Sequence, residues 1–88
     1  MRDRIKEVMA NSFDIPLSDI TDDAEINSIA NWDSLSHMIL MLELEAEFSV
    51  TIPTEKIASL LSLDQIETYI QEYALQKESE DTTGKAQH

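Results

Sequence analysis

The fold is decided by NWDSLSHMILMLELEAEFSV (residues 31–50), whose spacing predicts a single helix with two apolar sides. At about 100° per residue, one stripe of side chains comprises Leu40, Met41, Leu44 and Phe48. The opposite stripe comprises Leu35, Met38, Ile39, Leu42 and Ala46. A helix in a small domain usually has one apolar face, so the second stripe needs an explanation of its own.

Length and composition predict one small helical domain. The chain has 88 residues, which is enough for a single modest core. It contains one Gly and two Pro, a composition that disfavours a turn-rich β protein. The expected fold is an all-α, small four-helix bundle with a long loop between the first and second helices.

The hydrophobic spacing places the expected helices along the chain. They cover residues 2–13, a stretch from the N-cap Asp33 to about Phe48, residues 54–61, and a fourth stretch that opens with the capping box Ser62-Leu63-Asp64-Gln65. The loop of about twenty residues before Asp33 is longer than most connections in compact domains. Six aliphatic residues are expected to hold it on the core: Ile15, Leu17, Ile20, Ala24, Ile26 and Ile29.

The domain is expected to span residues 1–75. The remaining sequence, QKESEDTTGKAQH, has no large apolar residue. Such a segment cannot bury enough surface to offset the entropy of ordering it, so residues 76–88 are predicted to form a disordered polar tail.

Charge and composition exclude several classes of function. The net charge of −12 repels nucleic acid and anionic membranes and favours partners with basic patches. The absence of Cys excludes disulfides, thiolate zinc sites and a cysteine nucleophile, so any thiol would have to come from a prosthetic group. No segment resembles a signal peptide or could span a bilayer, and a monomeric cytoplasmic protein without membrane insertion is expected.

Ser34 is the candidate for covalent chemistry. It lies one residue beyond the expected cap, Asp33, at the start of the helix. Because Asp33 fills the capping role, the Ser34 hydroxyl should be exposed where the helix dipole favours an attached phosphate. The alternative interpretation of Ser34 is a second capping hydroxyl.

The segment WDSLSHMILMLELEAEFSVTIP resembles the acyl carrier protein family, in which Asp-Ser-Leu opens the second helix of a four-helix bundle. Leu40, Leu44 and Phe48 match that family's inward positions, and the resemblance covers roughly residues 2–75. It implies that Ser34, flanked by Asp33 and Leu35, is esterified by 4′-phosphopantetheine, whose thiol carries an acyl group as a thioester.

The same resemblance gives the second stripe a purpose. It implies that partner enzymes dock on the outward side of this helix, at Leu35, Met38, Ile39, Leu42, Glu43 and Ala46. The expected partners are a phosphopantetheinyl transferase, an acyl- or aminoacyl-loading ligase, and a downstream synthase or transferase with a basic docking patch. An exposed apolar patch is typical of an interaction surface. The alternative is a central helix buried on both sides.

Four residues depart from the family's common pattern. Asn31 stands where Gly is frequent in that family, and Trp32 replaces a residue that is usually small. Trp directly before Asp-Ser-Leu is similar to specialised carriers of polyketide, nonribosomal peptide or cell-surface polysaccharide pathways. Ile39 and Ala46 occupy positions that are often acidic. These departures favour a specialised pathway, such as a polyketide, lipid or polysaccharide one, over general fatty-acid synthesis.

Other residues of the sequence raise alternatives to this hypothesis. His37 lies one turn from Ser34, but nothing supplies the oxyanion hole of a Ser-His hydrolase, so His37 is expected to pack at the edge of the core and no catalytic residue is predicted. Trp32 is interpreted as a packing anchor for the loop, with lining of the pantetheine path as the alternative. The acidic residues Asp19, Asp22 and Asp23 do not match a calcium loop, and no metal site is predicted.

Two alternatives to an acyl carrier stay open. An aminoacyl, peptidyl or D-alanyl carrier would have a nearly identical helix signature. A non-enzymatic acidic helical module that binds a basic partner would lack the prosthetic group altogether. Mass spectrometry after incubation with coenzyme A and a phosphopantetheinyl transferase separates the carriers from the module.

Overall fold

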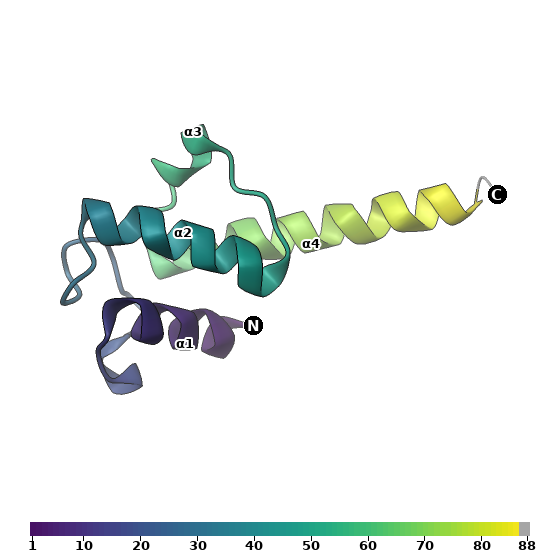
Figure 1. Cartoon of the computed structure of the whole chain (residues 1–88). Helices are drawn as coiled ribbons and strands as arrows, with labels where there is room; N and C mark the ends of the chain where they lie inside the picture. The colour runs from purple at the N-terminus through teal and green to yellow at the C-terminus, as the bar shows by residue number, and fades with distance from the viewer. Residues whose placement is uncertain (87–88) are drawn as a thin grey trace.

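The computed structural model describes the backbone of residues 1–86 and the side chains of residues 1–75. Its elements are α1 (Arg2–Phe13), the short 3-10 turn η1 (Leu17–Asp19), α2 (Ser34–Phe48), α3 (Thr54–Ile57) and α4 (Leu63–Ala86). In Figure 1, α2 lies between α1 and α3, and α4 runs past the bundle toward the C-terminus. This arrangement confirms the predicted all-α bundle with a long loop between its first two helices.

The core forms around the first of the two stripes of α2, which we call the inner stripe. Leu40, Met41 and Leu44 are almost fully shielded from solvent. The other fully buried large side chains of the same cluster come from α1 (Ile5 and Met9), from the loop (Trp32) and from α4 (Leu63, Ile66 and Ile70). Phe48, which was assigned to the same stripe, is half-buried at the end of the helix. The inner stripe is therefore confirmed, with its last member at the margin of the core.

The long loop is fastened to the segment that precedes α4. Backbone hydrogen bonds join Ile26 N–H to Leu61 C=O at 2.9 Å and Leu63 N–H to Ala24 C=O at 3.0 Å. Ile20 and Ala24 are buried, and Ile15, Ile26 and Ile29 pack partly against the core. Leu17 is the exception, because its side chain is 48% exposed on η1. The loop is anchored as predicted at five of the six positions, and the prediction for Leu17 is wrong.

Asn31 occupies the position at which the family described above often has glycine, and it has a left-handed backbone that glycine also adopts readily. Its φ is 68°, in the left-handed region that Asn tolerates better than most residues. The Asn31 side chain also donates from Nδ2 to the carbonyl of Phe13 at 2.8 Å. Phe13 is the last residue of α1, so this bond satisfies a carbonyl that the helix itself leaves without a partner. Glycine could adopt the backbone geometry but could not make this bond.

Two element boundaries differ from the prediction. Helix α3 covers Thr54–Ile57 rather than residues 54–61, because the chain turns after Ile57 and directs Leu60 into the core. Helix α4 begins at Leu63 as predicted, and Gln65 N–H donates to Ser62 Oγ at 3.2 Å. The Gln65 side chain accepts from Leu61 N–H at 3.0 Å, one residue earlier than in a regular capping box.

Helix α4 is also longer than the sequence indicated, because it continues to Ala86 through most of the segment predicted to be a disordered tail. Within residues 1–75, the last buried residue of α4 is Ile70, and Tyr73 packs partly against the core. Continuation past that point does not require a core. The residues Gln76, Lys77 and Glu78 have favourable intrinsic helix propensities and can extend a helix that is already nucleated.

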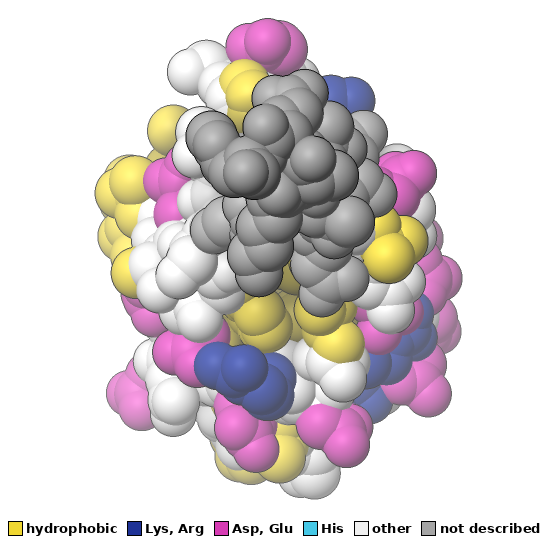
Figure 2. All heavy atoms as spheres, turned by 90° about the vertical axis from the view of Figure 1, so that its right-hand side faces the viewer, with side chains coloured by type: hydrophobic (Ala, Val, Ile, Leu, Met, Phe, Trp, Pro, Cys, Tyr) yellow, Lys and Arg dark blue, Asp and Glu magenta, His cyan; other side chains and the backbone are white. Residues whose placement is uncertain are grey.

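The three cationic residues of α1 join it to its neighbours. Arg2 pairs with Glu67 of α4 at 2.8 Å, Arg4 pairs with Glu47 of α2, and Lys6 pairs with Asp22 of the loop at 2.7 Å. On the face shown in Figure 2, Lys and Arg side chains lie beside Asp and Glu side chains. Pairs at the protein surface contribute little stability one by one, but here they reduce repulsion on a chain of high negative charge.

Removal of residues 77–88 should leave the melting temperature unchanged. The buried apolar residues of α4 within residues 63–75 are Leu63, Ile66 and Ile70, and the sequence of the removed segment contains no large apolar residue. Thermal melting followed by circular dichroism provides the measurement. As a control, Ile70→Ala should cost about 2–5 kcal/mol, as buried Ile→Ala substitutions do. A drop of several degrees on truncation would show that the segment packs on the domain.

Candidate functional site

The site is built at the first turn of α2. Asp33 has an extended backbone and is the N-cap, and its side chain accepts from Ser36 N–H at 2.9 Å. Ser34 is the first helical residue, and its side chain is exposed. The cap is therefore made by Asp33, as predicted, which leaves the Ser34 hydroxyl free to point into solvent.

The electrostatics of this turn suit an attached phosphate. The hydrogen bond from the Ser36 backbone N–H holds the pKa of Asp33 below its usual range, because it favours the charged carboxylate. The first backbone N–H groups of a helix have no intrahelical partner and attract negative charge. An exposed hydroxyl beside such groups fits a phosphodiester, because the phosphate can remain in solvent and face a positive helix end.

An apolar surface continues along α2 from this turn. Leu35 is 73% exposed, Leu42 is 65% exposed, and Met38 and Ile39 are each 46% exposed. These four residues are half of the eight large apolar side chains that are exposed within residues 1–75. Ala46 is exposed at the far end of the surface, and Glu43 is half-buried at its margin. The second stripe of the helix thus lies outside the core, and we call these six residues the α2 surface.

His37 and Trp32 lie beneath the site, in the core. His37 is 4% exposed, its Nδ1 accepts from Trp32 Nε1–H at 3.1 Å, and its Nε2 lies 2.9 Å from the carbonyl oxygen of Ile57. Trp32 also stacks on Phe13, with ring centroids 5.7 Å apart. Both ring nitrogens of His37 are occupied, so it cannot act as a base toward Ser34. The packing predicted for Trp32 and His37 is confirmed, but nothing in the sequence indicated the bond between them.

The comparison with known proteins decides the family. Residues 3–70 match the family model described as a phosphopantetheine attachment site. An acyl carrier protein of Brachyspira hyodysenteriae is 36% identical over 72 residues, which covers 81% of this chain and 92% of that protein. This chain belongs to the acyl carrier protein family.

Another relative comes from a biosynthetic synthase. The polyketide-8 synthase acyl carrier protein 2 of Streptomyces avermitilis is 27% identical over 62 residues, 70% of this chain and 71% of that protein. The family identifies the chain as a carrier rather than an enzyme, with 4′-phosphopantetheine as its prosthetic group. When bound, this group supplies the thiol that the chain itself lacks.

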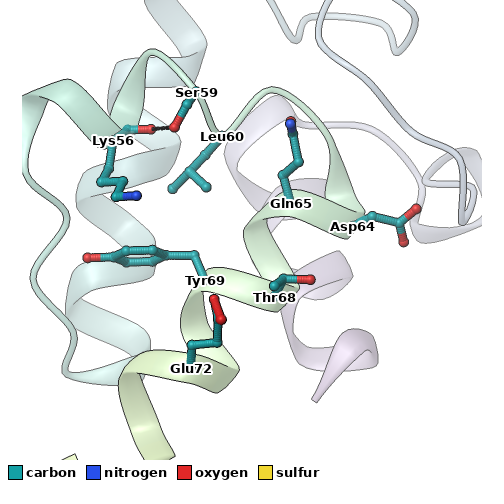
Figure 3. Close-up of a pocket in the computed structure, with 8 residues that line it drawn as sticks. All are labelled: Lys56, Ser59, Leu60, Asp64, Gln65, Thr68, Tyr69 and Glu72. Atoms are coloured by element: carbon teal, nitrogen blue, oxygen red, sulfur yellow. Dashed lines mark hydrogen bonds between the residues drawn. The ribbon is translucent and has the colours of Figure 1, made fainter. Parts of the chain in front are cut away.

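A groove of 340 Å³ lies between α3 and α4 of the carrier. Figure 3 shows Lys56 and Tyr69 reaching into it above Glu72, with Leu60 at its side. Burial raises the pKa of Tyr69, and its neutral hydroxyl donates to the Thr51 carbonyl at 2.7 Å. Every residue that lines the groove lies between residues 56 and 72, and none belongs to α2. The groove is therefore separate from the α2 surface.

Neither a metal cluster nor a membrane span was found in the described part of the carrier. Among these residues, no group of three or more His, Asp or Glu side chains is placed to hold a metal ion. The helices of the described residues are also too short or too polar to cross a bilayer. The site thus consists of a hydroxyl, a capped helix end and an apolar surface.

Substitution by Glu should hardly change the stability of the carrier on the outer side of α2 and should unfold it on the inner side. Ile39→Glu should change the free energy of unfolding by no more than about 0.5 kcal/mol, because the residue is half in solvent. Leu44→Glu should unfold the carrier, because it would bury a carboxylate without a partner. Thermal melting of both variants tests the assignment. Equal destabilisation by the two would mean that both sides of α2 are buried.

Proposed function

We propose that Ser34 is the residue to which phosphopantetheine is attached. The observation that carries this proposal is the division of roles at the start of α2, where Asp33 makes the cap and Ser34 presents an exposed hydroxyl. In the reaction, Ser34 Oγ attacks the phosphorus of coenzyme A that bears the pantetheine. A new O–P bond forms, the bond to the nucleotide phosphate breaks, and the hydroxyl proton leaves to a base of the transferase.

The α2 surface is proposed to be where partner enzymes bind. It begins next to Ser34, so an enzyme that reaches the prosthetic group there would also cover Leu35, Met38 and Ile39. Its exposed centre is apolar, with Glu43 at the margin, and the whole chain carries a charge of −12. A complementary partner would have an apolar patch surrounded by Lys or Arg. The transferase, the loading ligase and the downstream synthase or transferase are all expected to share this chemistry.

The cargo is proposed to be an acyl group of a specialised pathway, such as a polyketide, lipid or cell-surface polysaccharide pathway. Ile39 and Ala46 are both exposed, at positions that are often acidic in the family, so partners of this carrier would read an apolar surface there. The similarity to a polyketide synthase acyl carrier protein also supports a specialised pathway. Incubation of the modified carrier with a loading ligase and either fatty or amino acids separates this proposal from an aminoacyl or D-alanyl carrier.

Ser34→Ala should abolish modification while leaving the fold intact. Asp33 keeps the cap, and Ala is a good helix former at an exposed position. Mass spectrometry after incubation with coenzyme A and a phosphopantetheinyl transferase should show the added group on the parent protein only. Ser36→Ala, two residues along the same helix, is the matched control and should still be modified. Modification of the Ser34→Ala variant would place the attachment point elsewhere.

Ile39→Glu should impair loading much more than it impairs folding. A carboxylate on the α2 surface would lose its hydration in a complex without gaining a partner. We expect the rate of acyl loading to fall by about tenfold, which corresponds to 1.4 kcal/mol. The rate of acyl loading by the ligase measures the effect on the modified carrier. Ile39→Ala is the control that shortens the side chain without adding charge. Unchanged loading of the Glu variant would show that partners bind another surface.

A further inference from the structure

His37 has no part in the attachment of the prosthetic group as proposed above. It is nevertheless the one polar or charged residue that is buried within residues 1–75. A buried polar side chain is costly unless its hydrogen bonds are made, so its two partners decide why it is tolerated.

The two partners of His37 require the same neutral ring. Trp32 Nε1 can only donate, so Nδ1 of His37 must accept the bond at 3.1 Å. The carbonyl of Ile57 can only accept, so Nε2 must carry the proton in the contact at 2.9 Å. One imidazole with its proton on Nε2 satisfies both. The bonds connect three segments: the end of the loop, the first turns of α2, and the end of α3.

Helix α3 has little apolar packing of its own to fix its position. It is four residues long and none of the four is fully buried, and Ile57 packs only partly against the core. Before it, the chain is tied by the Glu45 carboxylate to Ile52 N–H at 2.7 Å and by the Tyr69 hydroxyl to the Thr51 carbonyl at 2.7 Å. At its end, the tie is the bond from His37 to Ile57, and Leu60 enters the core three residues later. Polar bonds therefore hold α3 on both sides.

The tie at the end of α3 lies next to the attachment site. His37 follows Ser34 by three residues, which places the two side chains on neighbouring parts of one helix surface. We infer that His37 is a positioning residue, which holds the end of α3 against α2 and so shapes the surface that a phosphopantetheinyl transferase meets around Ser34. The inference rests on the proposed attachment at Ser34.

Two substitutions of His37 separate this role from simple packing. His37→Leu fills the space but removes both bonds, whereas His37→Gln retains an amide N–H near the place of Nε2 that can donate to Ile57. Ile70→Val is the stability control, because it trims the core on α4 and leaves both bonds intact. All are prepared as the full chain, and each is assayed with coenzyme A and the transferase.

For His37→Leu, the KM of the transferase for the carrier should rise by between about twofold and tenfold, the range that one hydrogen bond supplies, with kcat little changed. His37→Gln should restore most of the KM, and Ile70→Val should leave it unchanged. An unchanged KM for His37→Leu, or an equal rise for Ile70→Val, would overturn the inference. So would failure of His37→Gln to restore the KM when it melts like the parent protein.

NMR of the parent protein tests the geometry even if His37→Leu does not fold. The ¹⁵N shifts of His37 should report a single neutral form with the proton on Nε2, and the amide signals of Thr54–Ile57 should stay near their parent positions in His37→Gln. A ring protonated on Nδ1, or a mixture of both forms, would overturn the inference. If the parent protein is not modified at Ser34, the proposed function fails, while these spectra still decide whether His37 holds α3.

Discussion

The burial of one side of α2 is the constraint on which the rest of the structure depends. Leu40, Met41 and Leu44 fill the centre of the core, and α1 and α4 pack around them. Burial of apolar area is the largest favourable contribution to folding, so it fixes the rotation of α2 about its axis. The rotation in turn leaves Leu35 and Leu42 in solvent. The exposed apolar surface is thus a direct consequence of how the core is filled.

The loop and α3 are held by specific polar bonds in addition to their apolar contacts with the core. The loop is tied through Asn31 to the end of α1 and through its backbone to the residues before α4. Helix α3 is tied by Glu45 and Tyr69 on one side and by His37 on the other. Such bonds are individually modest, but they are directional, so they determine position where apolar packing cannot. Both tied segments converge on the start of α2, where the prosthetic group is proposed to be attached.

The charged residues are also distributed unevenly between α1 and the α2 surface. Three of the six Lys and Arg residues lie on α1, and each pairs with an acidic residue on another element. These pairs place the cations of α1 beside carboxylates, at the contacts between α1 and its neighbours. The α2 surface contains no cation, and its charged member is Glu43. A partner with basic residues around an apolar patch would therefore meet complementary chemistry on α2.

The sequence alone determined the features that depend on near neighbours. The bounds of α1, the Asp33 cap and the two stripes of α2 follow from helical spacing and from capping chemistry within a few residues. The placement of Ser34 at an exposed helix start follows from the same local chemistry. Beyond residue 75 the sequence has no large apolar residue, so its pattern predicted the end of the ordered chain. The helix continues there, because residues of favourable helix propensity can extend it.

The tertiary structure alone decided the contacts that join distant residues. The two stripes of α2 are both apolar, so their composition does not say which one is buried. The bond from Asn31 to Phe13 and that from His37 to Ile57 each close a separation of 18 or 20 residues. The path of the chain sets such distances, and local propensity carries no record of that path. For the same reason, the exposure of Leu17 and the shortness of α3 became apparent only once the loop and the core were placed against each other.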